Sequence, residues 1–108
     1  MVHLITYELS GVRLPDEVSR IEAAIKALGG ECYAFHKSAW FVETELSNKD
    51  VCEKLAVHLR PRDRLVVTRV HRDWVAANVP AAETEWLEQR NFHSVNDQVG
   101  TATPFPRA

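Results

Sequence analysis

The order in which extended and helical patterns alternate along residues 2–70 constrains the fold more than any other feature of this chain. Apolar residues recur at helical spacing in 15–28 and in 47–59, and these segments separate β-favouring runs at 2–9, 31–44 and 64–70. The middle run divides at Lys37-Ser38, a polar break that predicts a hairpin between 31–36 and 39–44. The predicted order is therefore strand, helix, strand, strand, helix, strand.

The ends of both predicted helices carry recognisable signals. Pro15 suits the first helical position, and Gly29-Gly30 suits the C-terminal cap because glycine tolerates the left-handed conformation. Ser47 is a good N-cap for the second helix, and Pro61 prevents that helix from continuing. These boundaries favour two short, separate helices of the kind that cross from one strand to another.

The element order predicts an α+β protein with the ferredoxin-like βαββαβ arrangement. Right-handed crossovers place both helices on one face of a four-stranded antiparallel sheet with the strand order 4-1-3-2. The strands are apolar on both faces, as Leu4 beside Ile5 and Phe41 beside Val42 illustrate. The second face therefore needs a cover, since large exposed apolar patches are rare in monomers. A second copy of the chain is the simplest candidate, and the C-terminal segment is the other.

We divide the chain into a ferredoxin-like domain, residues 1–75, and a C-terminal helix and extended tail, residues 76–108. The tail opens with Asn78-Val79-Pro80, which predicts a short helix through about Asn91 anchored by Trp86 and Leu87. Beyond Asn91 the sequence turns polar, and we expect it to fray or to be ordered by a partner.

The composition favours one cytoplasmic globular domain. The 108 residues are 45% hydrophobic, which suits one globular domain with a single core. No apolar run approaches the roughly 20 residues that cross a bilayer, and Met1-Val2-His3 does not begin a signal peptide. We therefore expect a cytoplasmic protein that does not engage membranes, with Cys32 and Cys52 as reduced, packed thiols.

The most basic stretch lies between residues 58 and 72. It holds five arginines and one acid, Asp63, in a chain whose net charge is −2. Arginine suits phosphate because its planar fork gives two parallel hydrogen bonds. This stretch is the candidate nucleic-acid contact, with Arg69 and Arg72 expected to contribute most; the alternative is a solvated rim whose arginines pair with nearby acids. The candidates are Arg60, Arg62, Arg64, Arg69 and Arg72.

Three segments resemble a known group of small proteins. ITYELS in the first strand, KSAWFVET in the hairpin and RDRLVVTRVHRDW around the fourth strand look like the SinR-like proteins, relatives of the CRISPR-associated adaptation nuclease Cas-two and of the VapD ribonuclease toxins. The resemblance covers about residues 1–75. It implies a ferredoxin-like fold, a homodimer and a place in defence or toxin systems.

The resemblance also directs attention to Glu8. Nuclease members of that group carry Tyr-Asp at the end of the first strand, with two aspartates facing each other across the dimer axis near a divalent metal. The motif falls on Tyr7-Glu8 here, so Glu8 is the candidate catalytic and metal-binding residue, with Mg²⁺ as the only cofactor implied. Glutamate is longer than aspartate, and the favoured alternative is that this carboxylate at a strand exit is solvated or paired with a charge.

Two functional hypotheses follow. The first is a non-catalytic homodimeric interaction module that contacts nucleic acid through the arginine stretch. The second is a metal-dependent nuclease acting on RNA or DNA through a pair of Glu8 carboxylates. The longer acid, the single candidate carboxylate and the negative net charge favour the interaction module.

Overall fold

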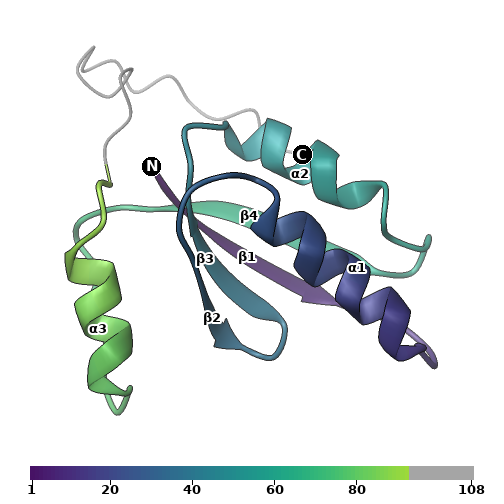
Figure 1. Cartoon of the computed structure of the whole chain (residues 1–108), viewed down its shortest axis with the longest axis horizontal. Helices are drawn as coiled ribbons and strands as arrows, with labels where there is room; N and C mark the ends of the chain where they lie inside the picture. The colour runs from purple at the N-terminus through teal and green to yellow at the C-terminus, as the bar shows by residue number, and fades with distance from the viewer. Residues whose placement is uncertain (93–108) are drawn as a thin grey trace.

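The computed structural model describes residues 1–92, which form four strands and three helices (Figure 1). Strand β4 begins and ends at the residues predicted, and the other elements differ from prediction by a few residues at their ends. In chain order the elements are β1 Val2–Glu8, α1 Pro15–Lys26, β2 Cys32–His36, β3 Ala39–Glu43, α2 Asn48–Ala56, β4 Arg64–Val70 and α3 Ala81–Glu88.

The four strands form one antiparallel sheet with the order β2-β3-β1-β4. Counted from the opposite edge, this is the order 4-1-3-2, and the arrangement is compatible with a ferredoxin-like fold. Strand β1 is central, which agrees with its apolar character: Ile5 and Tyr7 lie in the core on the helix side, and Val2 and Leu4 pack with apolar side chains on the other face. Strands β2 and β4 are the two edges.

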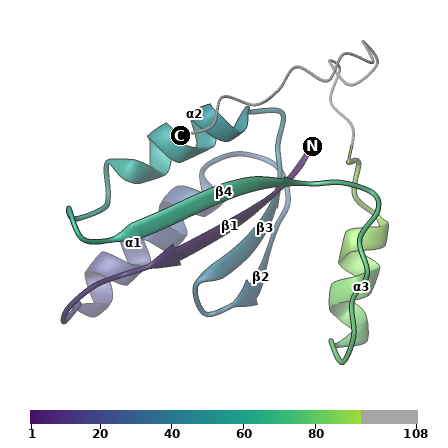
Figure 2. The same cartoon turned by 180° about the vertical axis from the view of Figure 1, so that it is seen from behind.

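Helices α1 and α2 lie on the same side of the sheet (Figures 1 and 2). The main core fills the space between them and the sheet, where Ile5 and Val42 from the strands meet Ile25 and Leu55 from the helices. Each of these four side chains is at most 2% exposed. This face is therefore a fully enclosed helix–sheet core.

The residues predicted to begin and end the helices lie at or near the helix ends in the structure. The Ser47 hydroxyl accepts a hydrogen bond from the Asp50 amide at 3.1 Å, which caps α2. Pro15 opens α1, and Gly29 and Gly30 both follow it with positive φ. Helix α1 ends at Lys26, two residues before the prediction, because Ala27 and Leu28 already bend toward the glycine turn.

The second face of the sheet is half covered by the chain itself. Helix α3 lies on the side opposite to α1 and α2 (Figures 1 and 2). Leu87 of α3 and the following Phe92 join Val2 and Phe41 of the sheet in a second apolar cluster. Of the two predicted covers, the C-terminal segment is therefore confirmed for this half, and a second copy is not needed there.

The C-terminal helix is shorter than predicted. It spans Ala81–Glu88 rather than 78–91, because Asn78 has a φ of 58°, a left-handed conformation that no helix continues. The predicted fraying beyond Asn91 falls almost entirely outside the described residues. Among the described residues, no helix is long and apolar enough to cross a membrane.

Candidate interaction surface at the end of β1 and along β4

Glu8, the candidate catalytic residue, is the last residue of β1 and is exposed. Its partner in the β1–β4 register is Arg64, which is exposed as well. Directly opposite residues of an antiparallel pair share one face of the sheet, so an acidic and a basic residue are cross-strand neighbours here. The face is the one that α1 and α2 leave uncovered.

Asp63, immediately before β4, is the centre of a buried polar cluster that the sequence analysis missed. Its carboxylate has no exposed surface and accepts hydrogen bonds from the Ser10 amide at 2.9 Å and the Arg60 amide at 2.8 Å. The guanidinium of Arg13, only 7% exposed, completes the site with an ion pair. The carboxylate thus fastens the loop after β1 to the loop before β4.

These contacts set the ionisation of Asp63. Burial alone raises the pKa of a carboxyl group, but the hydrogen bonds from the Arg60 and Ser10 amides and the charge of Arg13 outweigh that effect. The pKa of Asp63 therefore lies well below its usual range. A carboxylate held this firmly by donors is not available to a metal ion or to proton transfer.

Glu17, in the first turn of α1, extends the same cluster. One of its carboxylate oxygens accepts from Arg13 at 3.2 Å and from Arg60 at 2.5 Å. Arg60 also donates to the backbone carbonyl of Val12 at 3.4 Å. Asp63 and Glu17 are therefore both paired with arginines. We call Asp63, Arg13, Glu17 and Arg60 the loop clamp.

The five candidate arginines do not form a single patch. Arg60 belongs to the loop clamp, and Arg69 is half-buried and donates to the Phe92 carbonyl at 2.9 Å. Arg62 and Arg64 are exposed at the start of β4, while Arg72 is exposed beyond its other end. Seven strand residues span about 20 Å. Arg64 is therefore the candidate arginine that the register places opposite Glu8, whereas Arg72 lies about a strand length away.

The three tryptophans all pack against other side chains. Trp40 is 6% exposed in the main core, and Trp74 and Trp86 pack against the second cluster. The ring of Trp86 lies 5.8 Å from that of Tyr33, and the guanidinium of Arg90 lies 4.6 Å above it. These contacts fix α3 on β2 and leave the β1–β4 half of the face uncovered.

A narrow strip of that face remains open. It comprises Thr6 and Glu8 of β1 with Arg64, Val66 and Thr68 of β4. Val66 is 59% exposed, although it lies in the middle of an apolar strand. We call these five residues the open strip.

His3 of β1 is buried on the helix side of the sheet. Its ring nitrogens lie 2.6 Å from the Asn48 side-chain oxygen and 2.7 Å from the Leu46 carbonyl. Burial is the largest influence on its pKa, which is lowered, so the ring is neutral at pH 7.

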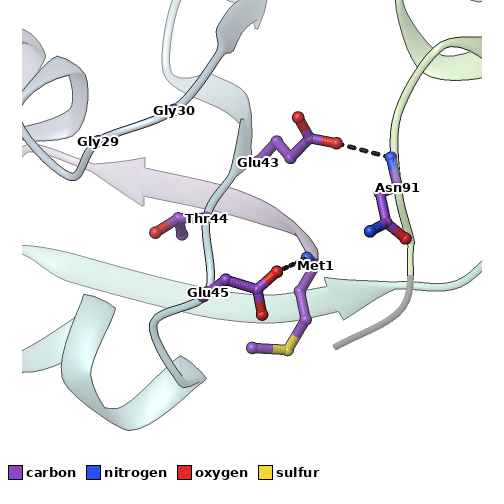
Figure 3. Close-up of a pocket in the computed structure, with 7 residues that line it drawn as sticks. All are labelled: Met1, Gly29, Gly30, Glu43, Thr44, Glu45 and Asn91. Carbon is purple, nitrogen blue, oxygen red and sulfur yellow. Dashed lines mark hydrogen bonds and ion pairs between the residues drawn. The ribbon is translucent and has the colours of Figure 1, made fainter. Parts of the chain in front are cut away.

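A groove of about 460 Å³ lies at the opposite end of β1, beside its first residue (Figure 3). Two acids line it, and both are already engaged: Glu43 accepts from the Asn91 amide at 2.6 Å, and Glu45 lies 3.6 Å from the N-terminal amine. Both acids of the groove are thus satisfied by local partners, and the groove lies at the end of β1 remote from Glu8.

Among residues 1–92 there is no group of three or more His, Cys, Asp or Glu side chains that could hold a metal ion. The chain matches no family model, and no curated protein matches its sequence.

Proposed function

We propose that this chain is a ferredoxin-like, homodimeric interaction module that does not cleave nucleic acid. The observation that carries the proposal is the loop clamp. It pairs the acids Asp63 and Glu17 with Arg13 and Arg60. Glu8 has Arg64 as its cross-strand neighbour, and residues 1–92 contain no group of three or more His, Cys, Asp or Glu side chains that could hold a metal ion.

This setting suits recognition better than metal-assisted hydrolysis. Magnesium in enzymes is usually held by carboxylates together with substrate phosphates and water, in near-ideal octahedral geometry. A cation beside the carboxylate competes with the metal for it, and Arg64 occupies the cross-strand position opposite Glu8. An adjacent acid and base on an open strip instead offer a partner one group of each sign.

The resemblance to the SinR-like proteins supports the same proposal. In that group a ferredoxin-like chain pairs with a second copy, and the position of the nuclease aspartate falls on Glu8. A glutamate opposite an arginine is what we expect of a relative that retains the fold without the reaction. The alternative is a metal-dependent nuclease that acts through Glu8, and a cleavage assay tests it directly.

The test is a cleavage assay with Mg²⁺ and with Mn²⁺ on RNA and on single- and double-stranded DNA. It compares the natural chain with Glu8→Gln, and Glu88→Gln serves as the control because Glu88 is an exposed acid of α3. We expect the three proteins to show equal, background cleavage. Metal-dependent cleavage that Glu8→Gln abolishes and Glu88→Gln retains would establish the nuclease instead.

Contact with nucleic acid, if this module makes it, runs through Arg62 and Arg64 rather than through Arg69. Arg64 is exposed on the open strip and Arg62 is exposed just before it, whereas Arg69 already donates to the Phe92 carbonyl. Binding by arginine and phosphate weakens as salt rises, because fewer counterions are favourably released. We expect the double change Arg62→Ala and Arg64→Ala to weaken binding and flatten its salt dependence. Arg20→Ala, an exposed arginine of α1, is the control and should do neither.

A further inference from the structure

The two edges of the sheet differ in how well they are protected. Strand β2 has five residues, contains a register shift between Ala34 and His36, and is covered by α3 through the Tyr33–Trp86 contact. Bulges and covering helices are the usual means of preventing an edge from pairing with another chain. One edge of the sheet is therefore well protected.

The β4 edge has none of these protections. It has seven residues, pairs with β1 in an uninterrupted register and contains no proline, and its two charged residues, Arg64 and Arg69, lie outside its apolar centre. Among residues 1–92, no strand pairs with its outer side. Its centre, Leu65-Val66-Val67, is apolar, and Val66 is 59% exposed. A long, regular, apolar edge is a template for adding another strand.

The register identifies which backbone groups face outward. The Tyr7 amide donates to the Ser38 carbonyl at 3.0 Å, so odd-numbered residues of β1 bond to β3 and even-numbered ones bond to β4. The partner of Thr6 is Val66, which therefore turns its backbone inward. The neighbouring residues Leu65 and Val67 direct their amides and carbonyls toward the free edge.

We infer that β4 pairs antiparallel with β4 of a second copy, about a two-fold axis that passes beside Val66. This inference rests on the proposed homodimer and names its interface. In that register Leu65 of each copy lies opposite Val67 of the other, and the outward backbone groups of both residues form hydrogen bonds. The two Val66 side chains meet at the axis, in the kind of pair where side chains approach most closely.

The apolar residues select this register over its neighbours. With the axis beside Val66, the apolar centre Leu65-Val66-Val67 of one copy lies opposite the same three residues of the second copy. Moving the axis to Val67 would set Leu65 opposite the second copy's Arg69, and moving it to Leu65 would set Val67 opposite the second copy's Asp63. Cross-strand side-chain pairs stabilise a sheet, and an apolar residue opposite a charged one loses that contact. The Val66 register therefore keeps the most apolar pairs across the axis.

The same geometry separates the two Glu8 residues. Each lies one strand and two residues away from the axis, which places their Cα atoms about 20 Å apart for ordinary strand spacing and rise. Glutamate side chains cannot bridge that distance to one metal ion. The inferred interface thus gives a continuous eight-stranded sheet with two distant Glu8–Arg64 sites, in agreement with a module that does not cleave.

The test is disulfide formation in the full chain carrying Val66→Cys, with diamide as the oxidant and non-reducing electrophoresis as the readout. Cα atoms in a non-hydrogen-bonded pair lie about 4.5 Å apart, within the range that a disulfide spans. The controls are the natural chain, which carries Cys32 and Cys52, and Val75→Cys, whose position is 94% exposed. We expect Val66→Cys to form covalent dimers about tenfold faster than Val75→Cys.

A second variant covers the case in which the cysteine disturbs the strand. Val66→Lys places a charge on the axis and should convert the dimer to a monomer with its circular dichroism spectrum unchanged, whereas Val75→Lys should leave the dimer intact. A natural chain that sediments as a dimer, with equal crosslinking of both cysteine variants and no effect of Val66→Lys, would overturn the β4 interface and leave the homodimer standing. A natural chain that sediments as a monomer would overturn both.

Discussion

Replacing Gly30 by alanine would place a methyl group 1.9 Å from the carbonyl oxygen of Glu43, where an ordinary contact is 3.4–4 Å. Glu43 cannot easily move away, because its amide is bonded to the Glu31 carbonyl at 2.8 Å and its carboxylate to the Asn91 amide. Gly29 supplies a matched control: it also has a positive φ, yet an added methyl group there meets nothing within 4 Å.

The two substitutions therefore separate conformational strain from steric overlap. Both pay the cost of a left-handed alanine, about 1–2 kcal/mol. Gly30→Ala adds the cost of moving packed backbone, about 1–3 kcal/mol by analogy with overpacked cores. A difference of about 2 kcal/mol corresponds to about 10 °C in Tm for a domain of this size. Thermal unfolding followed by circular dichroism measures it, and equal Tm values for the two variants would refute the close approach of Gly30 to β3.

Two further predictions concern ionisable groups. The pKa of His3 is lowered in the folded chain, so the unfolded chain binds more protons below pH 6.5. The free energy of unfolding should therefore fall as the pH drops from 7 to 5. Denaturant titrations at each pH would measure this dependence, and His3→Gln should make it weaker. The pKa of Asp63 is also lowered, so its contribution is present above its ordinary value of 3.8 and is lost only in stronger acid. Asp63→Asn at pH 7 should therefore speed amide hydrogen exchange in residues 9–14 and 60–63. Asp73→Asn, at an exposed position, is the control. Unchanged exchange in both variants would show that the loop clamp does not hold these two loops together.

The fold was accessible from the sequence because its signals are local. Pro15, Ser47 and Gly29-Gly30 mark helix ends through their own backbone preferences, and the apolar spacing between them identifies the faces. The sequence predicts that the second face of the sheet is covered, but the hydrophobic pattern does not distinguish the C-terminal segment of the same chain from a second copy. Trp86 and Leu87 were recognised as anchors, but the sheet residues they contact lie some 50 positions away.

The site was harder to predict because it depends on contacts between loops. Asp63 looked like one acid that offset several arginines, whereas it is the buried acceptor for Ser10, Arg13 and Arg60. The sequence does place Asp63 three residues after Arg60 in a turn that contains Pro61, and this spacing could have indicated that the Asp63 carboxylate accepts from the Arg60 amide. The arginine stretch was treated as a unit in the sequence, yet strand geometry divides it, since a seven-residue strand separates Arg62 from Arg72.

Sedimentation equilibrium of the full chain at micromolar concentration tests the central claim most directly, because every step from the unprotected β4 edge to the interaction module requires a second copy. The account predicts a single species of twice the 12.3 kDa chain mass, converted to monomer by Val66→Lys. A natural chain of 12.3 kDa across the whole concentration range would contradict it, and would mean that the β4 edge remains unpaired in solution or serves a different partner.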